Sequence, residues 1–149
     1  MKPGRRIGFD FGDVRIGVAV SDQSGLLASP LDFLPNNSGE VNEKIAELLS
    51  VYDPIYIAIG YPLHLSGNES AKSESVSGFA REISNLTEAP IYLIDERMTT
   101  VSANRSLREA GHNSKSARGE VDSVAAAAIL ESALNQERIQ GQPLNRFHP

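Results

Sequence analysis

The stretch RIGFDFGDVRIGVAVSD, residues 6–22, contains two apolar runs rich in β-branched residues on either side of Gly12-Asp13. Two such runs around a Gly-Asp pair predict a β-hairpin. A third strand is expected over residues 26–34, so the chain should begin as an antiparallel meander.

Beyond this meander, helices and strands are expected to alternate. The apolar runs at residues 55–60 and 91–94 lack the alternation of a half-exposed strand, which is typical of central strands covered on both faces. Helices are expected where apolar residues recur at helical spacing: residues 40–52, 76–86, a segment from Thr99 or Thr100 to just before Gly111, and, after a polar segment at 112–119, an Ala-rich segment over about 121–138. The pattern predicts an α/β fold whose mixed sheet is antiparallel at one side and covered by helices.

The length of 149 residues fits one domain, expected over residues 1–140, with a loose C-terminal tail at 141–149. Cysteine is absent, which excludes disulfides, thiolate metal sites and cysteine nucleophiles and is compatible with a reducing cytoplasm. No stretch is apolar enough for a membrane span, and the N-terminus lacks the apolar core of a signal peptide. A cytoplasmic location without membrane contact is therefore expected.

Three acidic residues stand where an unpaired carboxylate is costly. Asp10 lies within the apolar run of residues 7–12 and needs a partner or a cation. Glu96 follows the run 91–94, at the edge where parallel strands end and ligands usually bind, whereas strand alternation points Asp95 to the other side. Simpler roles stay open: Asp10 as a cap of the hairpin turn, and Glu96 as an acid favoured at the start of the next helix.

The third acidic residue, Asp122, belongs to the long Ala-rich helix. It shares a helical face with Ala125, Ala126, Ile129 and Ala133, three, four, seven and eleven positions further on. Because that face is apolar, the helix should press it against the sheet and carry one carboxylate into the contact. The alternative is an ordinary capping acid at the start of a helix.

Carboxylates from two strand ends and one helix start can converge on divalent cations. Mg²⁺ and Mn²⁺ prefer oxygen ligands, and two such ions about 3.5–4 Å apart support phosphodiester hydrolysis by activating water and stabilising the leaving oxygen. We therefore expect Asp10, Glu96 and Asp122 to be both catalytic and metal-binding, with two Mg²⁺ or Mn²⁺ ions as cofactors.

The charge distribution separates this site from the bulk of the chain. Lys and Arg number 14 against 19 Asp and Glu, a net charge of −5, which argues against a protein that coats nucleic acid. Residues 97–119 reverse this balance, because Glu109 is their only acidic residue and five cations are present: Arg97, Arg105, Arg108, Lys115 and Arg118. These cations either bind phosphates or form a solvated helix face. Lys72, at the end of a polar loop over residues 61–72, is likewise either a phosphate contact or an exposed loop residue.

Four motifs together carry a resemblance to a known family: GFDFGDVRIGVAVSD, IGYPLHLSGNES, IDERMTTVSANRSLREAG and VDSVAAAAILES. In this order and spacing the chain resembles the YqgF/RuvX family over about residues 5–138. The resemblance implies a ribonuclease H-like fold with a five-stranded mixed sheet flanked by helices, and an acidic site at Asp10, Glu96 and Asp122. Resolvases of the RuvC type place a glutamate near the position of Gly60, where this sequence has none, so Glu96 has to substitute for it.

Family members are described as Holliday junction resolvases and, in many bacteria, as nucleases that mature the 5′ end of pre-16S rRNA. The resemblance therefore implies a metal-dependent endonuclease acting on structured nucleic acid, with precursor rRNA favoured over branched DNA. Two other classes stay open: a non-catalytic nucleic-acid binding module, and an ATP-binding domain of the actin and Hsp70 type, which normally closes two such domains over its nucleotide. A monomer and a homodimer are both compatible with the sequence.

Overall fold

The computed structural model describes residues 1–149 except 38, 63–70 and 97–113. In its last helix the side chains are described only from Ser123 onward. Its described strands form one sheet in the order β3-β2-β1-β4-β5. Their bounds are β1 Ile7–Phe11, β2 Arg15–Ser21, β3 Ala28–Pro35, β4 Ile57–Tyr61 and β5 Ile91–Asp95. Strands β1, β2 and β3 pair antiparallel, whereas β1 with β4 and β4 with β5 pair parallel. The predicted mixed sheet with its antiparallel side is confirmed.

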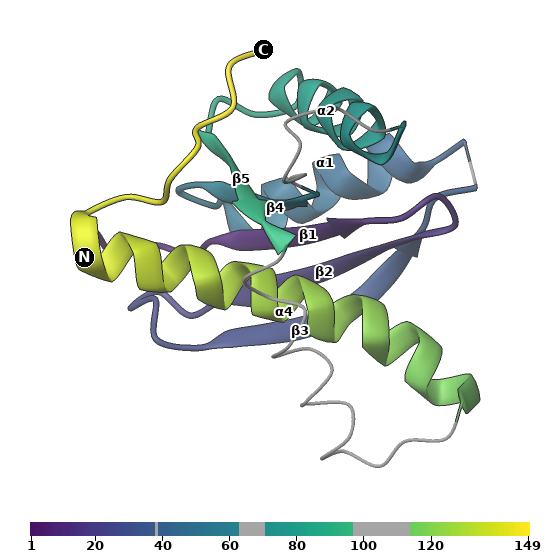
Figure 1. The fold of residues 1–149 in the computed structure, drawn as a ribbon, viewed down its shortest axis with the longest axis horizontal. Helices are drawn as coiled ribbons and strands as arrows, with labels where there is room; N and C mark the ends of the chain where they lie inside the picture. The colour runs from purple at the N-terminus through teal and green to yellow at the C-terminus, as the bar shows by residue number, and fades with distance from the viewer. Residues whose placement is uncertain (38, 63–70, 97–113) are drawn as a thin grey trace.

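Helices cover both faces of the sheet (Figure 1). Helices α1 (Val41–Tyr52) and α2 (Ala71–Ser84) lie on one face, and the long helix α4 (Ser114–Gln140) crosses the other. Helix α4 begins at Ser114, earlier than expected. Residues 114–119, which the sequence analysis assigns to a polar segment before the helix, form part of it. The helix expected from Thr99 or Thr100 lies outside the described residues. None of the described helices is long and apolar enough to cross a membrane.

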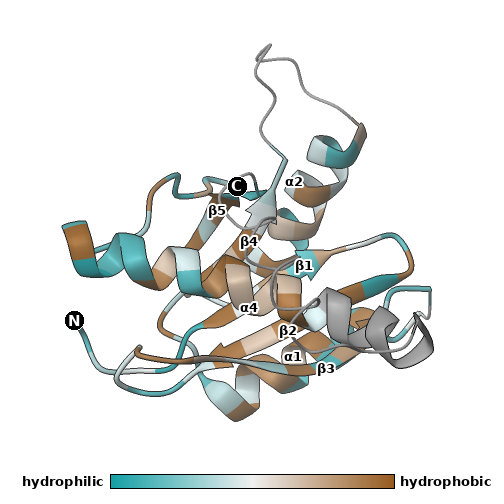
Figure 2. Cartoon of the chain, turned by 60° about the horizontal axis from the view of Figure 1, so that its bottom comes forward, coloured by the Kyte–Doolittle hydropathy of each residue, from teal (hydrophilic) through white to brown (hydrophobic). Residues whose placement is uncertain are grey.

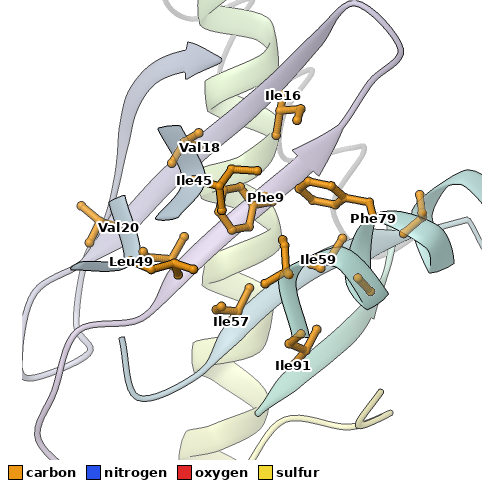
Figure 3. Packing of buried hydrophobic residues seen from close by; sticks show 14 residues of the cluster. Phe9, Ile16, Val18, Val20, Ile45, Leu49, Ile57, Ile59, Phe79 and Ile91 are labelled. Carbon is orange, nitrogen blue, oxygen red and sulfur yellow. The ribbon is translucent and has the colours of Figure 1, made fainter. Parts of the chain in front are cut away.

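The face under α1 and α2 holds a core of large apolar side chains (Figure 3). Phe9 of β1 packs edge-on against Phe79 of α2, with 5.6 Å between ring centroids, and Ile45 and Leu49 of α1 contact the same cluster. Figure 2 shows hydrophobic residues concentrated along the strands between the helical layers. Burial of these side chains is what fixes α1 and α2 on this face.

Small residues form the closest contact between α4 and the sheet, beside larger apolar side chains such as Leu130 and Tyr92. A Cβ added to Gly8 would lie 2.9 Å from both the Ala126 carbonyl oxygen and the Leu130 Cβ. Ala58 of β4 and Ala133 of α4 are fully buried in the same contact. Glycine in β1 and alanine in α4 therefore let the helix backbone lie directly on the sheet.

Helix α4 is anchored at its C-terminal end by a buried ion pair. The Arg6 guanidinium, fully buried just before β1, lies 2.7 Å from Glu137 Oε2, and the Tyr56 hydroxyl donates to Glu137 Oε1 at 2.9 Å. Burial and the Glu137 carboxylate raise the pKa of Tyr56 above its ordinary value. This contact fixes the direction of α4 as antiparallel to β1.

The residues after Gly141 are not the loose tail that the sequence predicts. The Leu93 amide donates to the Asn145 carbonyl at 3.0 Å, and the Phe147 amide donates to the Ile91 carbonyl at 2.7 Å. The Phe147 ring also packs against the core. This segment therefore pairs with the outer edge of β5, because an edge strand offers unpaired backbone groups.

Replacement of Glu137 by alanine should destabilise the protein by about 3–5 kcal/mol, because it leaves the buried Arg6 charge without a partner. Chemical denaturation measures the free energy of unfolding. Tyr56→Phe is the matched control, since it removes one hydrogen bond and should cost only about 1–3 kcal/mol. Equal losses in the two variants would show that the ion pair does not anchor the helix.

Candidate metal and nucleic-acid site

Asp10 lies near the C-terminal end of β1, on the face covered by α4. It pairs with Gly17 of β2, and residue alternation places it on the same face as Gly8, which contacts α4. The residue is half-buried and makes an interaction with its surroundings. The carboxylate therefore stands at the edge where β1, β4 and β5 all end, as the sequence predicts.

Glu96 follows β5 and reaches over the end of β4. A Cβ built on Gly60 would lie 3.2 Å from both Glu96 Cγ and Glu96 Oε1, and 2.5 Å from Ile129 Cδ1 of α4. The Glu96 side chain thus occupies the space above Gly60 on the α4 face. Strands β1 and β4 pair as far as Phe9 with Ile59, so the next residues along, Asp10 and Gly60, lie level with each other. The missing side chain of Gly60 admits the Glu96 carboxylate beside Asp10.

The neighbouring carboxylate, Asp95, belongs to the opposite face. It pairs with Tyr61, whose side chain packs against the core under α1 and α2. Asp95 makes its own interaction there and is not a free group. Strand alternation, which favours Glu96 over Asp95 as the partner of Asp10, is consistent with this placement.

The backbone of α4 brings Asp122 toward the same end of the sheet. Glu137 lies beside Arg6, and Ala126 and Leu130 lie over Gly8, so α4 runs toward the end of β1 as residue numbers fall. One helical turn is about 5.4 Å and two strand residues span about 6.6 Å, so the turn containing Asp122 comes level with Asp10. The side chain of Asp122 lies outside the described residues. On the face that the sequence assigns to it, Ala126, Ile129 and Ala133 are buried as predicted, whereas Ala125 is only half-buried.

The donor chemistry at this edge suits a hard divalent cation. Asp10 and Glu96 supply carboxylate oxygens on one sheet face, and Mg²⁺ and Mn²⁺ bind mainly oxygen ligands. Among the described side chains no group of three acidic or histidine residues gathers at one point. The backbone of α4 brings the turn that contains Asp122 to this end of the sheet.

Helix α2 begins at this same edge. Lys72 donates from Nζ to the Phe11 carbonyl at 2.5 Å, and the buried Ser73 hydroxyl donates to the Pro62 carbonyl at 3.3 Å. These bonds join the start of α2 to the ends of β1 and β4. Lys72, expected within a loop, therefore lies in a helix with its ammonium one residue from Asp10 along β1.

The basic residues expected to bind nucleic acid are not placed by the structure. Arg97, Arg105 and Arg108 lie outside the described residues, and of Lys115 and Arg118 only the helical backbone is described. Arg15, which the sequence pattern does not single out, lies at the start of β2 on the face of Asp10, within the N-terminal hairpin.

The order and direction of the strands match solved structures of known fold. A solved structure of Thermus thermophilus RuvC in complex with a Holliday junction substrate matches with a TM-score of 0.65 at 16% identity, over 94% of this chain and 99% of that chain. A second Thermus thermophilus RuvC structure matches with a TM-score of 0.57 at 19% identity, with the same coverage. The predicted ribonuclease H-like fold of the RuvC type is confirmed.

The sequence comparison is more specific. Residues 4–136 match the family model RuvX, described as Holliday junction resolvase, and the chain belongs to that family. Relatives carrying the name "Putative pre-16S rRNA nuclease" include those of Streptomyces coelicolor, 39% identical over 96% of this chain and 87% of the relative, and of Clavibacter michiganensis, 40% identical over 100% and 94%. That of Mycobacteroides abscessus is 41% identical over 91% and 83%. The expected membership of the YqgF/RuvX family is confirmed.

The contact at Gly60 is testable by a double-mutant cycle. Gly60→Ala should cost about 1–3 kcal/mol of unfolding free energy, because the new methyl group meets Ile129 Cδ1. Ile129→Val removes that atom and alone should cost about 0.5–1.5 kcal/mol. The double variant should lose less unfolding free energy than the two single variants together. Urea denaturation should give a coupling energy of at least about 0.5 kcal/mol. Additive losses would show that the side chain of residue 129 does not lie over Gly60.

Proposed function

We propose that this protein is a divalent-metal-dependent endonuclease that acts in the cytoplasm on structured nucleic acid and matures the 5′ end of pre-16S rRNA. The observation that carries the proposal is the Glu96 carboxylate lying over Gly60, level with Asp10, at the edge where the parallel strands end. The names of its relatives support precursor rRNA as the substrate.

In this proposal Asp10, Glu96 and Asp122 hold Mg²⁺ or Mn²⁺. Bound metal would supply an activated water and stabilise the leaving oxygen of a phosphodiester. The chain's own contribution is placement: Asp10 belongs to β1, and Glu96 shares the space above Gly60 with Ile129. Carboxylates held in this way lose little side-chain freedom when they take up ligands. Lys72 and the cations at Arg97, Arg105, Arg108, Lys115 and Arg118 would neutralise backbone phosphates.

Cleavage of four-way DNA is a second candidate, favoured by the description of the matching family model. A junction resolvase cuts two strands and needs paired active sites, which a symmetric homodimer would supply. An rRNA-processing enzyme needs one site and can act as a monomer. The molecular mass in solution with and without a four-way junction therefore helps to separate the two candidates.

The direct test is cleavage by the purified protein with Mn²⁺ or Mg²⁺. The substrates are an RNA spanning the precursor 5′ end of 16S rRNA and a four-way DNA junction. Asp10→Asn and Glu96→Gln should each lower the cleavage rate by at least about a hundredfold, the order of loss that follows removal of a group stabilising a transition state. Isothermal titration with Mn²⁺ should show weaker binding in both variants.

Asp95→Asn is the matched control, because it neutralises the adjacent carboxylate on the opposite face of the sheet. This variant should cleave at close to the wild-type rate. Cleavage that survives Asp10→Asn would contradict the proposed site. A wild-type protein that binds RNA but neither binds Mn²⁺ nor cleaves either substrate would instead be a non-catalytic binding module.

A further inference from the structure

On the side of Asp10 that faces away from Glu96, one arginine is stacked on an aromatic ring. Arg15 is the first residue of β2, and its guanidinium carbon lies 5.1 Å from the centre of the Phe33 ring on β3. Both residues are half-buried. A guanidinium over an aromatic face is held by the ring quadrupole, so Arg15 is confined to one region of the surface.

The strand register places this guanidinium on the face of Asp10. Asp10 pairs with Gly17 and Phe11 pairs with Ile16, so Arg15 stands two residues from Gly17, just beyond the end of β1. Diagonal neighbours of this kind have Cα atoms about 7–8 Å apart, within reach of a long side chain. Arg15 therefore lies on the β2 side of Asp10, whereas Glu96 lies on the β4 side of Asp10.

The floor between Asp10 and Arg15 carries no side chains. The two positions that would fill it are Gly12 and Gly17. Gly12 lies so close to β2 that a Cβ there would be 2.6 Å from the Arg15 carbonyl oxygen. A carboxylate and a guanidinium therefore stand on either side of the backbone at Gly12 and Gly17.

Within the part of the chain that the structure describes, Arg15 forms no ion pair, and of the described cations Arg6 alone does so, with Glu137 at the far end of the sheet. The contact with Phe33 uses the positive charge but not the guanidinium N–H groups, which can bind a phosphate in bidentate fashion. Lysine at this position would offer the charge without the stack or the fork.

We propose that Arg15, held on Phe33, binds a backbone phosphate of the nucleic-acid substrate immediately beside the Asp10 carboxylate. The inference rests on the proposed function for the nature of the substrate and adds one specific contact to it. It assigns the β2 side of the site to substrate and the β4 side to Glu96. One cation therefore positions the strand that is to be cut.

The test measures binding and not cleavage, so that it is independent of catalysis. Fluorescence anisotropy with the labelled precursor 16S RNA gives the dissociation constant over a range of KCl concentrations. Arg15→Ala should weaken binding about tenfold and reduce the slope of log affinity against log salt by about 0.7–0.9, the loss of one phosphate contact. Arg15→Lys should retain the slope and lose part of the affinity, as should Phe33→Leu, which removes the stack alone.

Arg81→Ala is the matched control, since it removes an exposed cation from the last turn of α2, away from the edge where that helix begins. It should change neither the affinity nor the slope. Wild-type affinity and slope in a folded Arg15→Ala variant would overturn the inference and leave Arg15 as a packing residue. Loss of binding without a smaller slope would also overturn it. Wild-type protein that binds RNA through Arg15 but does not cleave it would refute the proposed catalysis and leave this contact standing.

Discussion

The close approach of α4 to the sheet determines which residues can stand on that face and how the helix lies over β1. At Gly8 the helix backbone and the Leu130 Cβ come within 2.9 Å of where a side chain would begin. Such an approach requires glycine in the strand and small residues along the helix, and Ala126 and Ala133 satisfy it. Because Arg6 and Glu137 lock the helix at one end, its position over β1 is fixed in register as well as in distance. The turn containing Asp122 then has to come level with Asp10.

The same constraint explains why the site draws a carboxylate from β5. Gly60 ends the buried part of β4, and the space above it is shared by the tip of Ile129 and the side chain of Glu96. Any side chain at this position would compete with both. The absence of a side chain at Gly60 therefore leaves room for the Glu96 side chain to lie above the end of β4.

Much of this arrangement can be predicted from the sequence, and each prediction that was wrong or missing has a physical cause. Alternation along β5 distinguishes Glu96 from Asp95, because a strand end has only two directions in which a side chain can point. The contact of the last residues with β5 cannot be predicted from the sequence. The hydrogen bond between Phe147 and Ile91 requires that β5 be an edge strand, which only the assembled sheet shows. The start of α4 is predicted too late because residues 114–119 are polar. They are compatible with a helix but lack the apolar periodicity that would predict one. Arg15 is overlooked because its role depends on Phe33, 18 positions away, and on the register that brings them together.

The distribution of charge at the sheet edge accounts for how an acidic protein can act on a polyanion. A net charge of −5 repels nucleic acid at long range, and this repulsion is screened beyond about 8–10 Å at physiological salt. Within that distance the local groups decide. Arg15 lies beside Asp10 on the α4 face, whereas the Lys72 ammonium contacts the end of β1 from helix α2, which packs on the opposite face. Cations bound by the carboxylates would remove the remaining negative charge, so attraction would arise only where both metal and substrate phosphate fit. Under the proposed function, an overall negative charge would disfavour binding elsewhere on the surface and would confine contact with nucleic acid to this edge.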